Sequence, residues 1–550
     1  MTDDLAARLA AVLPSGHNFG IYHLSTPPTK TNALFHAPPG QRPDRTFIES
    51  HFLGVTITHV PGPKGSIDGD EEVLAFALEI FIFTTAYSST FFVAKADSSG
   101  YLHLLGLPKG TPSPIRAVSS VFLTFLVEQR RRAGVPSIIS LFARSQSQYL
   151  FPGSVDNPGK HVLDDRGLVK WWCRVLDPLL LAANGTETDA QAKGWKNAQG
   201  YLVVPGLDTY ETRAFLPRRP DQQKQWTLGH PLESISHYVT NDAPRPPPRC
   251  LIPQYPDDPK ARYLDELDEE AERTSGKEDK SGGKTTATGQ NGGWNGQWKS
   301  VKSLDQFWEM MAFRQECSSG RLTGFLWIVF EPEGTASVAA AARQEGAAAA
   351  SKQTPTKKKK KQALRGYIVS RRPRPKTQQR YALAARPTST AYYRWPVAGR
   401  GRLLVDESDY KRINELLLQL DFSTFEKSAA STRRWVHEAG IGSGDWRVLV
   451  VGTQTPVASS NGQDGHSGQS SNGVTDLSNL VKRKRAPSEA DTAAEPQTKG
   501  TANGAVNVLS AGLVRKKQKH VESTPEEAVP TGAPAVNVLS AGLVRKKPKA

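Results

Sequence analysis

Residues 73–93 read VLAFALEIFIFTTAYSSTFFV and form a long apolar run within the 550-residue chain. Branched and aromatic side chains dominate this run, which favours β-strands over a helix. Glu79 and the polar stretch at 84–90 interrupt it, so the run is not typical of a membrane-spanning helix. We therefore predict two buried strands, at 73–83 and 90–95, joined by a turn, and we expect no contact with a membrane.

The surrounding sequence alternates further strand patterns with helical ones. Residues 51–59 and 137–143 read as strands, and the apolar positions from 118 to 126 recur at helical spacing. That helix has a basic end and a glycine stop at Gly134. A second helix starts after Asp164 or Asp165, which can cap it, and Pro178 should kink or end it. A third spans 407–420. The pattern predicts an α/β fold.

Charge is distributed very unevenly along this chain. The formal net charge is +16, and residues 352–402 contain sixteen Lys or Arg and no Asp or Glu. Such a segment is typical of a solvated loop, a nuclear-import signal or a surface for nucleic acid and similar polyanions. The three cysteines, Cys173, Cys250 and Cys317, have no metal-ligand spacing and are too few for a disulfide framework. We expect an intracellular protein without a metal site.

Low-complexity sequence divides the chain. Residues 274–295 and about 334–362 read as disordered loops inside a body that extends from 1 to 451. Residues 452–550 are predicted to form a disordered basic tail. Positions 505–517 read AVNVLSAGLVRKK, positions 535–547 repeat the same thirteen residues, and 474–485 is a degenerate copy. Import signals explain the basic clusters only. The apolar strips favour peptides that add a strand or helix to an acidic partner.

Four local clusters combine polar and aromatic residues in ways that suit chemistry. They are 94–101 (AKADSSGY), 144–152 (RSQSQYLFP), His161 with the later pair Trp171 and Trp172, and 255–263 (YPDDPKARY). Phosphate loops, nucleophile elbows and metal-ligand histidine pairs are not visible. Arg144 follows a strand, at the kind of edge where α/β proteins bind ligands.

Each cluster also has an ordinary structural interpretation. Trp172 is more often a core residue than the wall of a ligand site, and His161 is more often a loop histidine with a satisfied hydrogen bond. The Asp257–Asp258 pair is typical of a helix cap, with Pro259 at the first helical position. The individual clusters therefore leave structure and function open.

Together the clusters resemble the fungal histone acetyltransferases of the KAT-eleven family, distant relatives of the metazoan CBP-type acetyltransferases. SQYLFP at 147–152, KWW at 170–172 and PDDPKAR at 256–262 carry the resemblance, which extends from the N-terminus to about 451. It implies a twisted mixed β-sheet wrapped by helices that holds acetyl-CoA at the end of the strand 137–143. It also implies a nuclear enzyme of replication-coupled nucleosome assembly, the DNA-damage response, DNA repair and transcription regulation.

The resemblance also assigns roles to individual residues. The residues implied to line the channel for cofactor and lysine are Ala96, Asp97, Ser98, Phe142, Arg144, Gln146, Tyr149, His161 and Trp172. Gln146 replaces the small residue that is usual there. Lys260 corresponds to a buried lysine that acetylates itself, with Asp257 and Asp258 as the acidic pair beside it.

The chemistry requires a base, because a lysine near pKa 10.4 must lose a proton before it attacks a thioester. Asp258 is the first candidate and Asp97 the second, although Asp97 fits a positioning role better; Trp172 and Tyr149 complete the catalytic set. No cysteine lies in the motifs, which predicts direct transfer without an acyl-enzyme.

The resemblance also implies partners. They are an H3/H4 histone dimer, a nucleosome-assembly-type chaperone and, through the C-terminal repeats, the anti-silencing chaperone. The alternative is a non-enzymatic basic scaffold that binds chromatin or nucleic acid. That alternative explains the charge of the chain but gives the four clusters no role.

Overall fold

The computed structural model describes residues 3–59, 71–108, 111, 113–184, 195–218, 225–240, 244–275, 297–314, 321–333 and 383–455. All of them belong to one compact unit, which covers residues 1–463. The three tail repeats and nearly all of the two predicted internal loops lie outside the described residues, as does the basic run at 357–361.

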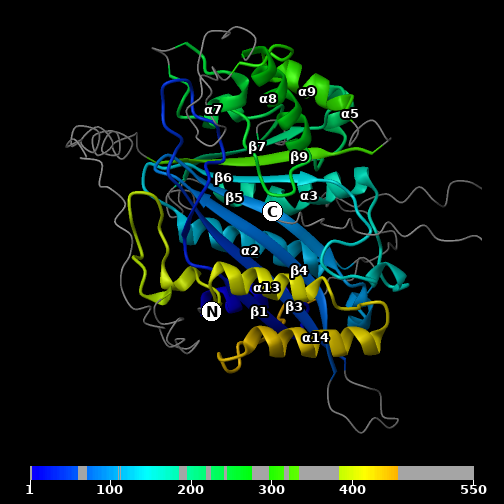
Figure 1. Cartoon of the computed structure of the whole chain (residues 1–550). Helices are drawn as coiled ribbons and strands as arrows, with labels where there is room; N and C mark the ends of the chain where they lie inside the picture. The colour runs from blue at the N-terminus through cyan, green and yellow to red at the C-terminus, as the bar shows by residue number, and fades with distance from the viewer. Residues whose placement is uncertain are drawn as a thin grey trace, which may run out of the picture. The chain divides into compact units, whose positions relative to one another are not determined.

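A single mixed sheet of eleven strands organises this unit (Figure 1). The strand order is β10-β1-β3-β4-β5-β6-β9-β7-β8, with β11 paired to β1 and β2 paired to β3. The β5–β6 pair is parallel, whereas β3–β4 and β4–β5 are antiparallel. The strands are β1 (Asn18–Ser25), β2 (Thr29–Thr31), β3 (Thr46–His59), β4 (Glu71–Thr84), β5 (Ser89–Ser98), β6 (Ser137–Ala143), β7 (Trp195–Val203), β8 (Trp226–Leu228), β9 (Gly324–Pro332), β10 (Leu403–Leu404) and β11 (Val448–Val451).

Helices cover both faces of the sheet. The α-helices are α1 (Asp3–Val12), α2 (Pro114–Arg130), α3 (Asp165–Ala183), α5 (Thr209–Arg213), α7 (Leu232–Ile235), α8 (Ala261–Ser275), α9 (Leu304–Ala312), α13 (Glu407–Leu417) and α14 (Phe425–Gly440). Short 3₁₀ helices are η1 (Tyr101–Leu105), η2 (Ser154–Asp156), η3 (Pro248–Cys250) and η4 (Val397–Gly399).

Strand alternation divides the core between the two faces. Leu53 and Ile139 pack in a cluster with α1, α2 and α3, whereas their neighbours Phe52 and Ile138 face the other side. There α13 and α14 cover one part of the sheet, and α8 and α9 cover another. Because both faces are buried, the central strands are almost continuously apolar, as in the run from which the fold was predicted.

The predicted mixed α/β fold is confirmed, and so is the hairpin, now seen as β4 and β5. The strand 137–143 is β6 with the predicted bounds. Asp164 caps α3, since its side chain accepts a hydrogen bond from the Gly167 amide. No described helix is long and apolar enough to cross a membrane.

Helix ends depart from the predictions at three places. Pro178 lies inside α3, which continues to Ala183, so the idea that it ends the helix is wrong. Leu179 and Leu180 beyond it are buried, and their packing offsets the lost hydrogen bond. The helix predicted to reach 420 ends at Leu417. Pro259 precedes α8, which begins at Ala261, so the proline is not the first helical residue.

Candidate active site

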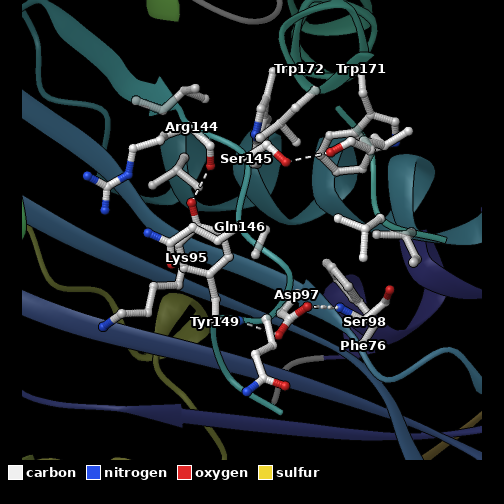
Figure 2. Close-up of a pocket in the computed structure, with 18 of the residues that line it drawn as sticks. Phe76, Lys95, Asp97, Ser98, Arg144, Ser145, Gln146, Tyr149, Trp171 and Trp172 are labelled. Carbon is white, nitrogen blue, oxygen red and sulfur yellow. Dashed lines mark hydrogen bonds between the residues drawn. The ribbon is translucent and has the colours of Figure 1, made fainter. Parts of the chain in front are cut away.

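A cavity opens where two parallel strands separate. The pairing of β5 with β6 stops at Phe92 and Ser140, and beyond this point the carboxyl ends of the strands diverge. The cavity between them has a volume of about 760 Å³, within the usual range for small-molecule and cofactor sites. Its walls come from the end of β5, the end of β6 and the loop after it, residues 159–163, α3 and the 257–259 loop (Figure 2).

Asp97 fixes the loop that follows β6. Its Oδ2 accepts hydrogen bonds from the backbone amides of residues 149, 150 and 151, at 2.7, 2.9 and 3.3 Å. Its Oδ1 accepts one from the Ser98 amide at 2.8 Å, and the Lys160 ammonium lies 2.9 Å away. Both side chains of this ion pair are almost completely buried. Asp97 therefore joins the end of β5 to two separate loops of the cavity wall.

The same loop is held from the helix side. Asp165, at the start of α3, accepts the backbone amides of Ser145 and Leu322, each at 3.1 Å. The Tyr149 hydroxyl donates to the Arg144 carbonyl, across the loop. Burial raises the pKa of Tyr149, and the charge of Arg144 opposes this increase. Tyr149 is therefore a neutral hydrogen-bond donor at neutral pH.

The helix α3 supplies an aromatic wall. Trp171 and Trp172 meet edge to face, with ring centroids 4.8 Å apart, and Trp172 is buried. Leu168 lies one turn earlier and also lines the cavity, while Leu141 and Phe142 of β6 contribute further apolar surface. A chain of methylenes or a thioester would therefore find an apolar surface here.

Asp258 and Lys260 form a compact buried ion pair at the cavity wall. The Lys260 ammonium lies 2.7 Å from each carboxylate oxygen of Asp258. The backbone amides of Lys260 and Tyr255 also donate to this carboxylate, at 2.9 and 3.2 Å. The Tyr255 ring stacks on Phe92 of β5, with centroids 4.2 Å apart. The stacked ring fastens the 255–260 segment to the sheet, and burial raises the pKa of its hydroxyl.

A second, more open ion pair lies at the same wall. The Lys95 ammonium is 3.2 Å from Glu79 and 3.6 Å from Asp257. The Asp257 side chain is 79% exposed, and its backbone has a φ of 53°, a conformation that few residues other than glycine adopt. Burial lowers the pKa of Lys95, but the charges of Glu79 and Asp257 outweigh this and raise it overall. Glu79 also accepts the Tyr410 hydroxyl of α13 at 3.0 Å.

The structure brings the residues singled out in the sequence to this one cavity. The lining includes Ala96, Asp97, Ser98, Phe142, Arg144, Gln146, Tyr149, His161, Trp172, Asp257 and Asp258. Lys260 lies directly behind Asp258. Lys160, Asp165 and Trp171 were not predicted to line or position the cavity, although Asp165 was a candidate helix cap and Trp171 belonged to one of the four clusters. Lys160 binds Asp97, 63 residues away, and Asp165 accepts a hydrogen bond from the Ser145 amide, 20 residues away. No local sequence pattern predicts such distant pairs.

The groups of three or more His, Cys, Asp or Glu side chains that a metal ion needs do not occur among the described residues. The cavity lining combines an apolar wall with a few polar groups. Such a wall suits a long acyl carrier better than a small, highly charged ligand.

Comparison with known proteins identifies the family of this chain. The model of the histone acetyltransferase KAT11-type domain matches residues 5–138 and 133–438. The chain is 38% identical to the histone acetyltransferase rtt109 of Aspergillus flavus, over 94% of this chain and 99% of that protein. It is 33% identical to the histone acetyltransferase rtt109 of Schizosaccharomyces pombe, over 46% of this chain and 56% of that protein.

A solved structure shows the same fold. The crystal structure of Rtt109 from Aspergillus fumigatus is similar with a TM-score of 0.61 and 38% identity, covering 82% of this chain and all of that one. The family model, the relatives and the fold agree, and the resemblance drawn from the three motifs is confirmed. The chain belongs to the family of KAT11-type histone acetyltransferases and is itself a histone acetyltransferase.

Proposed function

We propose that the cavity between β5 and β6 binds acetyl-CoA and passes its acetyl group directly to lysines of newly made histone H3. The observation that carries this proposal is the meeting of eleven residues, selected from the sequence alone, on one cavity wall. They come from five separate parts of the chain, so their convergence is not a consequence of sequence proximity.

The walls suit the parts of such a substrate. Phe142 and Trp172 offer apolar surface to the thioester arm and to the methylenes of the incoming lysine. Arg144 and His161 also line the cavity, and we propose that they bind the phosphate groups. Ala96 and Ser98, near the end of β5, and Gln146 also line the cavity. We propose that the backbone at Gln146 makes the contact with the cofactor, so the larger side chain there changes little.

The reaction itself is a simple displacement. A neutral lysine amine attacks the thioester carbonyl, the carbon–sulfur bond breaks, and the thiol of coenzyme A leaves with a proton. The aromatic wall at Trp172 favours the neutral amine, because desolvation lowers the pKa of a lysine. The described lining contains no cysteine, and we propose direct transfer. An acyl-cysteine found on the reaction path would refute it.

We propose Asp258 as the general base, with its basicity controlled by Lys260. In the described geometry both carboxylate oxygens are occupied by the Lys260 ammonium and by two backbone amides, and such bonds hold a carboxylate in its charged form. Acetylation of Lys260 would replace the ammonium by a neutral amide. That change would remove the buried positive charge and leave Asp258 freer to accept a proton. Asp257 is the more exposed member of the acidic pair.

Asp97 serves a different purpose in this proposal. Its carboxylate already accepts four backbone amides and the Lys160 ammonium, so it is a positioning residue. It shapes the loop that carries Tyr149, whose hydroxyl and ring lie at the channel.

The cellular setting is part of the same proposal. We infer a nuclear enzyme that acts on H3/H4 dimers during replication-coupled assembly and DNA repair, with a nucleosome-assembly-type chaperone and the anti-silencing chaperone as partners. The tail repeats at 505–517 and 535–547 would bind the chaperone–histone complex, and their duplication raises the local concentration of the binding peptide. Deletion of residues 505–550 should then weaken histone acetylation but leave the affinity for acetyl-CoA unchanged.

Intact-mass spectrometry tests the proposal. The full chain is incubated with acetyl-CoA and a chaperone-bound H3/H4 dimer, and both products are weighed. We expect acetyl increments on the histone and one on the chain, with the latter lost in Lys260→Arg. Trp172→Ala should bind acetyl-CoA more weakly, whereas Asp258→Asn should bind it but transfer slowly. Thermal shift by acetyl-CoA is the control, because a scaffold would show none. No increment on the histone would refute histone transfer.

A further inference from the structure

A group of arginines surrounds a tight turn far from the cavity. The turn spans residues 389–394 and is closed by a bridge between Ser389 and Arg394. Arg132 donates hydrogen bonds to the carbonyls of Ala391 and Ser88, at 3.3 and 2.9 Å. Arg394 donates to the Arg131 carbonyl at 3.0 Å. Two distant segments of the chain, the end of α2 and the turn, are thus joined by guanidinium groups.

Two further arginines link the region of the turn to the N-terminal part of the chain. The Arg45 guanidinium lies over the Tyr392 ring, 5.3 Å from its centroid. Arg386 donates to the Pro28 carbonyl at 2.6 Å. We call the five residues the 389–394 surface; its members are Arg45, Arg131, Arg132, Arg386 and Arg394.

The positive charge of this surface is not compensated within the described residues. None of the ion pairs found there joins one of the five arginines to a carboxylate. Asp44, next to Arg45, lies 3.4 Å from His237, and Glu49 is buried against Arg130. The Arg132 Nε is buried with no described hydrogen-bond partner, and burial lowers the pKa of Arg132 to about 10. An anion would stabilise these groups.

The surface and the cavity lie at opposite ends of the same strand. Arg132 contacts Ser88 and Ser89, where β5 begins, and the cavity is lined by β5 from Val93 to Ser98. The strand from Ser89 to Val93 spans about 13 Å. In Figure 1 the segment before α13, drawn in yellow, lies on the side of the sheet where β5 starts. None of the five arginines is among the described residues that line the cavity.

We propose that the 389–394 surface binds the phosphate backbone of duplex nucleic acid. Guanidinium groups match phosphate oxygens in pairs, and those of Arg132, Arg386 and Arg394 are held in place by carbonyls. Residues 352–382, which lie outside the described residues and are not part of this surface, contain twelve Lys or Arg and no acid. A duplex carries one charge per roughly 1.7 Å, a density that fits this row of cations better than the scattered carboxylates of an acidic protein.

Fluorescence anisotropy with a labelled 20-base-pair duplex tests the proposal in the full chain without acetyl-CoA. The test variant is Arg45→Glu/Arg131→Glu/Arg394→Glu. The matched control is Arg213→Glu/Arg433→Glu/Arg434→Glu, which makes the same change of net charge at exposed residues of α5 and α14. We expect the test variant to bind at least about tenfold more weakly, with a log-log salt slope shallower by about 3. The control should lose no more than about twofold.

Three results would overturn the proposal. They are equal losses in the two variants, no duplex binding by the unmodified chain, and tighter binding of poly-glutamate than of the duplex. The last would indicate an acidic protein partner. Should the charge reversals reduce the melting temperature, Arg45→Gln/Arg131→Gln replaces them, because these two side chains donate no described hydrogen bond. The thermal shift with acetyl-CoA should be the same in all variants, which separates this surface from acetyl transfer.

Discussion

Asp97 and Asp258 are both buried carboxylates on the cavity wall, and each is paired with a lysine and with backbone amides. Asp97 draws its partners from distant parts of the chain, since Lys160 is 63 residues away and the three loop amides begin 52 residues away. Asp258 finds its lysine two residues away. The same kind of ion pair therefore forms a long-range cross-link at Asp97 and stabilises a local turn at Asp258.

The difference predicts which pair the fold depends on more. Loss of Asp97 removes the carboxylate partner of the buried Lys160 ammonium, which keeps only the Ser154 hydroxyl, and takes the shared acceptor from the backbone amides of residues 149–151. Loss of Asp258 leaves the same kind of unpaired charge, but within one short segment that the Tyr255 ring still fastens to Phe92. Three variants test whether the long-range pair contributes more to stability than the local pairs.

The largest effect is expected for Asp97→Ala. Removal of one partner of a buried ion pair costs about 3–5 kcal/mol, and the loop at 149–151 should lose its anchor. We expect a lower free energy of unfolding in urea and a large loss of affinity for acetyl-CoA by calorimetry. Glu269→Ala is the control, because it removes an exposed pair with Arg273 and should cost less than about 1 kcal/mol. Equal costs for the two variants would contradict the cross-link.

An intermediate effect is expected for Asp258→Asn. The amide cannot neutralise the Lys260 ammonium, so the variant should lose about 3 kcal/mol of unfolding free energy. The double variant Asp258→Asn/Lys260→Met should be more stable than Asp258→Asn alone, since no unpaired charge then remains buried. Urea denaturation of the four proteins gives the coupling energy. A coupling near zero would mean that the two groups do not interact in solution.

The smallest effect is expected for Lys95→Met, at the more open pair with Glu79 and Asp257. The folded pKa of Lys95 is raised above 10.5, so its stabilising contribution is complete below the unfolded pKa and is lost as pH rises through the folded value. The difference in unfolding free energy between the unmodified chain and the variant should stay constant from pH 7 to about 9.5 and shrink above about 10.5. A difference that grows above pH 10.5 would contradict the ion pair.

The sequence predicted the central part of the fold well, for a physical reason. Strands buried on both faces must be apolar at nearly every position, so β4, β5 and β6 can be read directly from the chain. Helix α2 has apolar residues at regular helical spacing, so it is equally predictable from the sequence. Two predicted helix ends were wrong, the alternative that Pro178 ends α3 and the extension of α13 to residue 420. The end of a helix depends on tertiary packing, which the local sequence does not reveal.

The residues of the candidate site also fall into those that the sequence identified and those that only the structure revealed. Asp97, Tyr149, Trp172 and Asp258 lie in motifs that a reader of the sequence can single out. Their motifs assigned them to the KAT-eleven family without any knowledge of where the side chains lie. The sequence by itself therefore determined the family, the strand that ends at the cavity and the residues worth testing.

Only the tertiary structure decided how those residues act on one another. Lys160 and Asp165 became wall-building residues because the fold brings them to partners that lie far away in the chain. The arginines of the 389–394 surface form one group for the same reason, since they come from three separate segments of the chain. Hydrogen bonds and ion pairs act over a few ångströms, and only a folded chain brings residues so distant in sequence within that range.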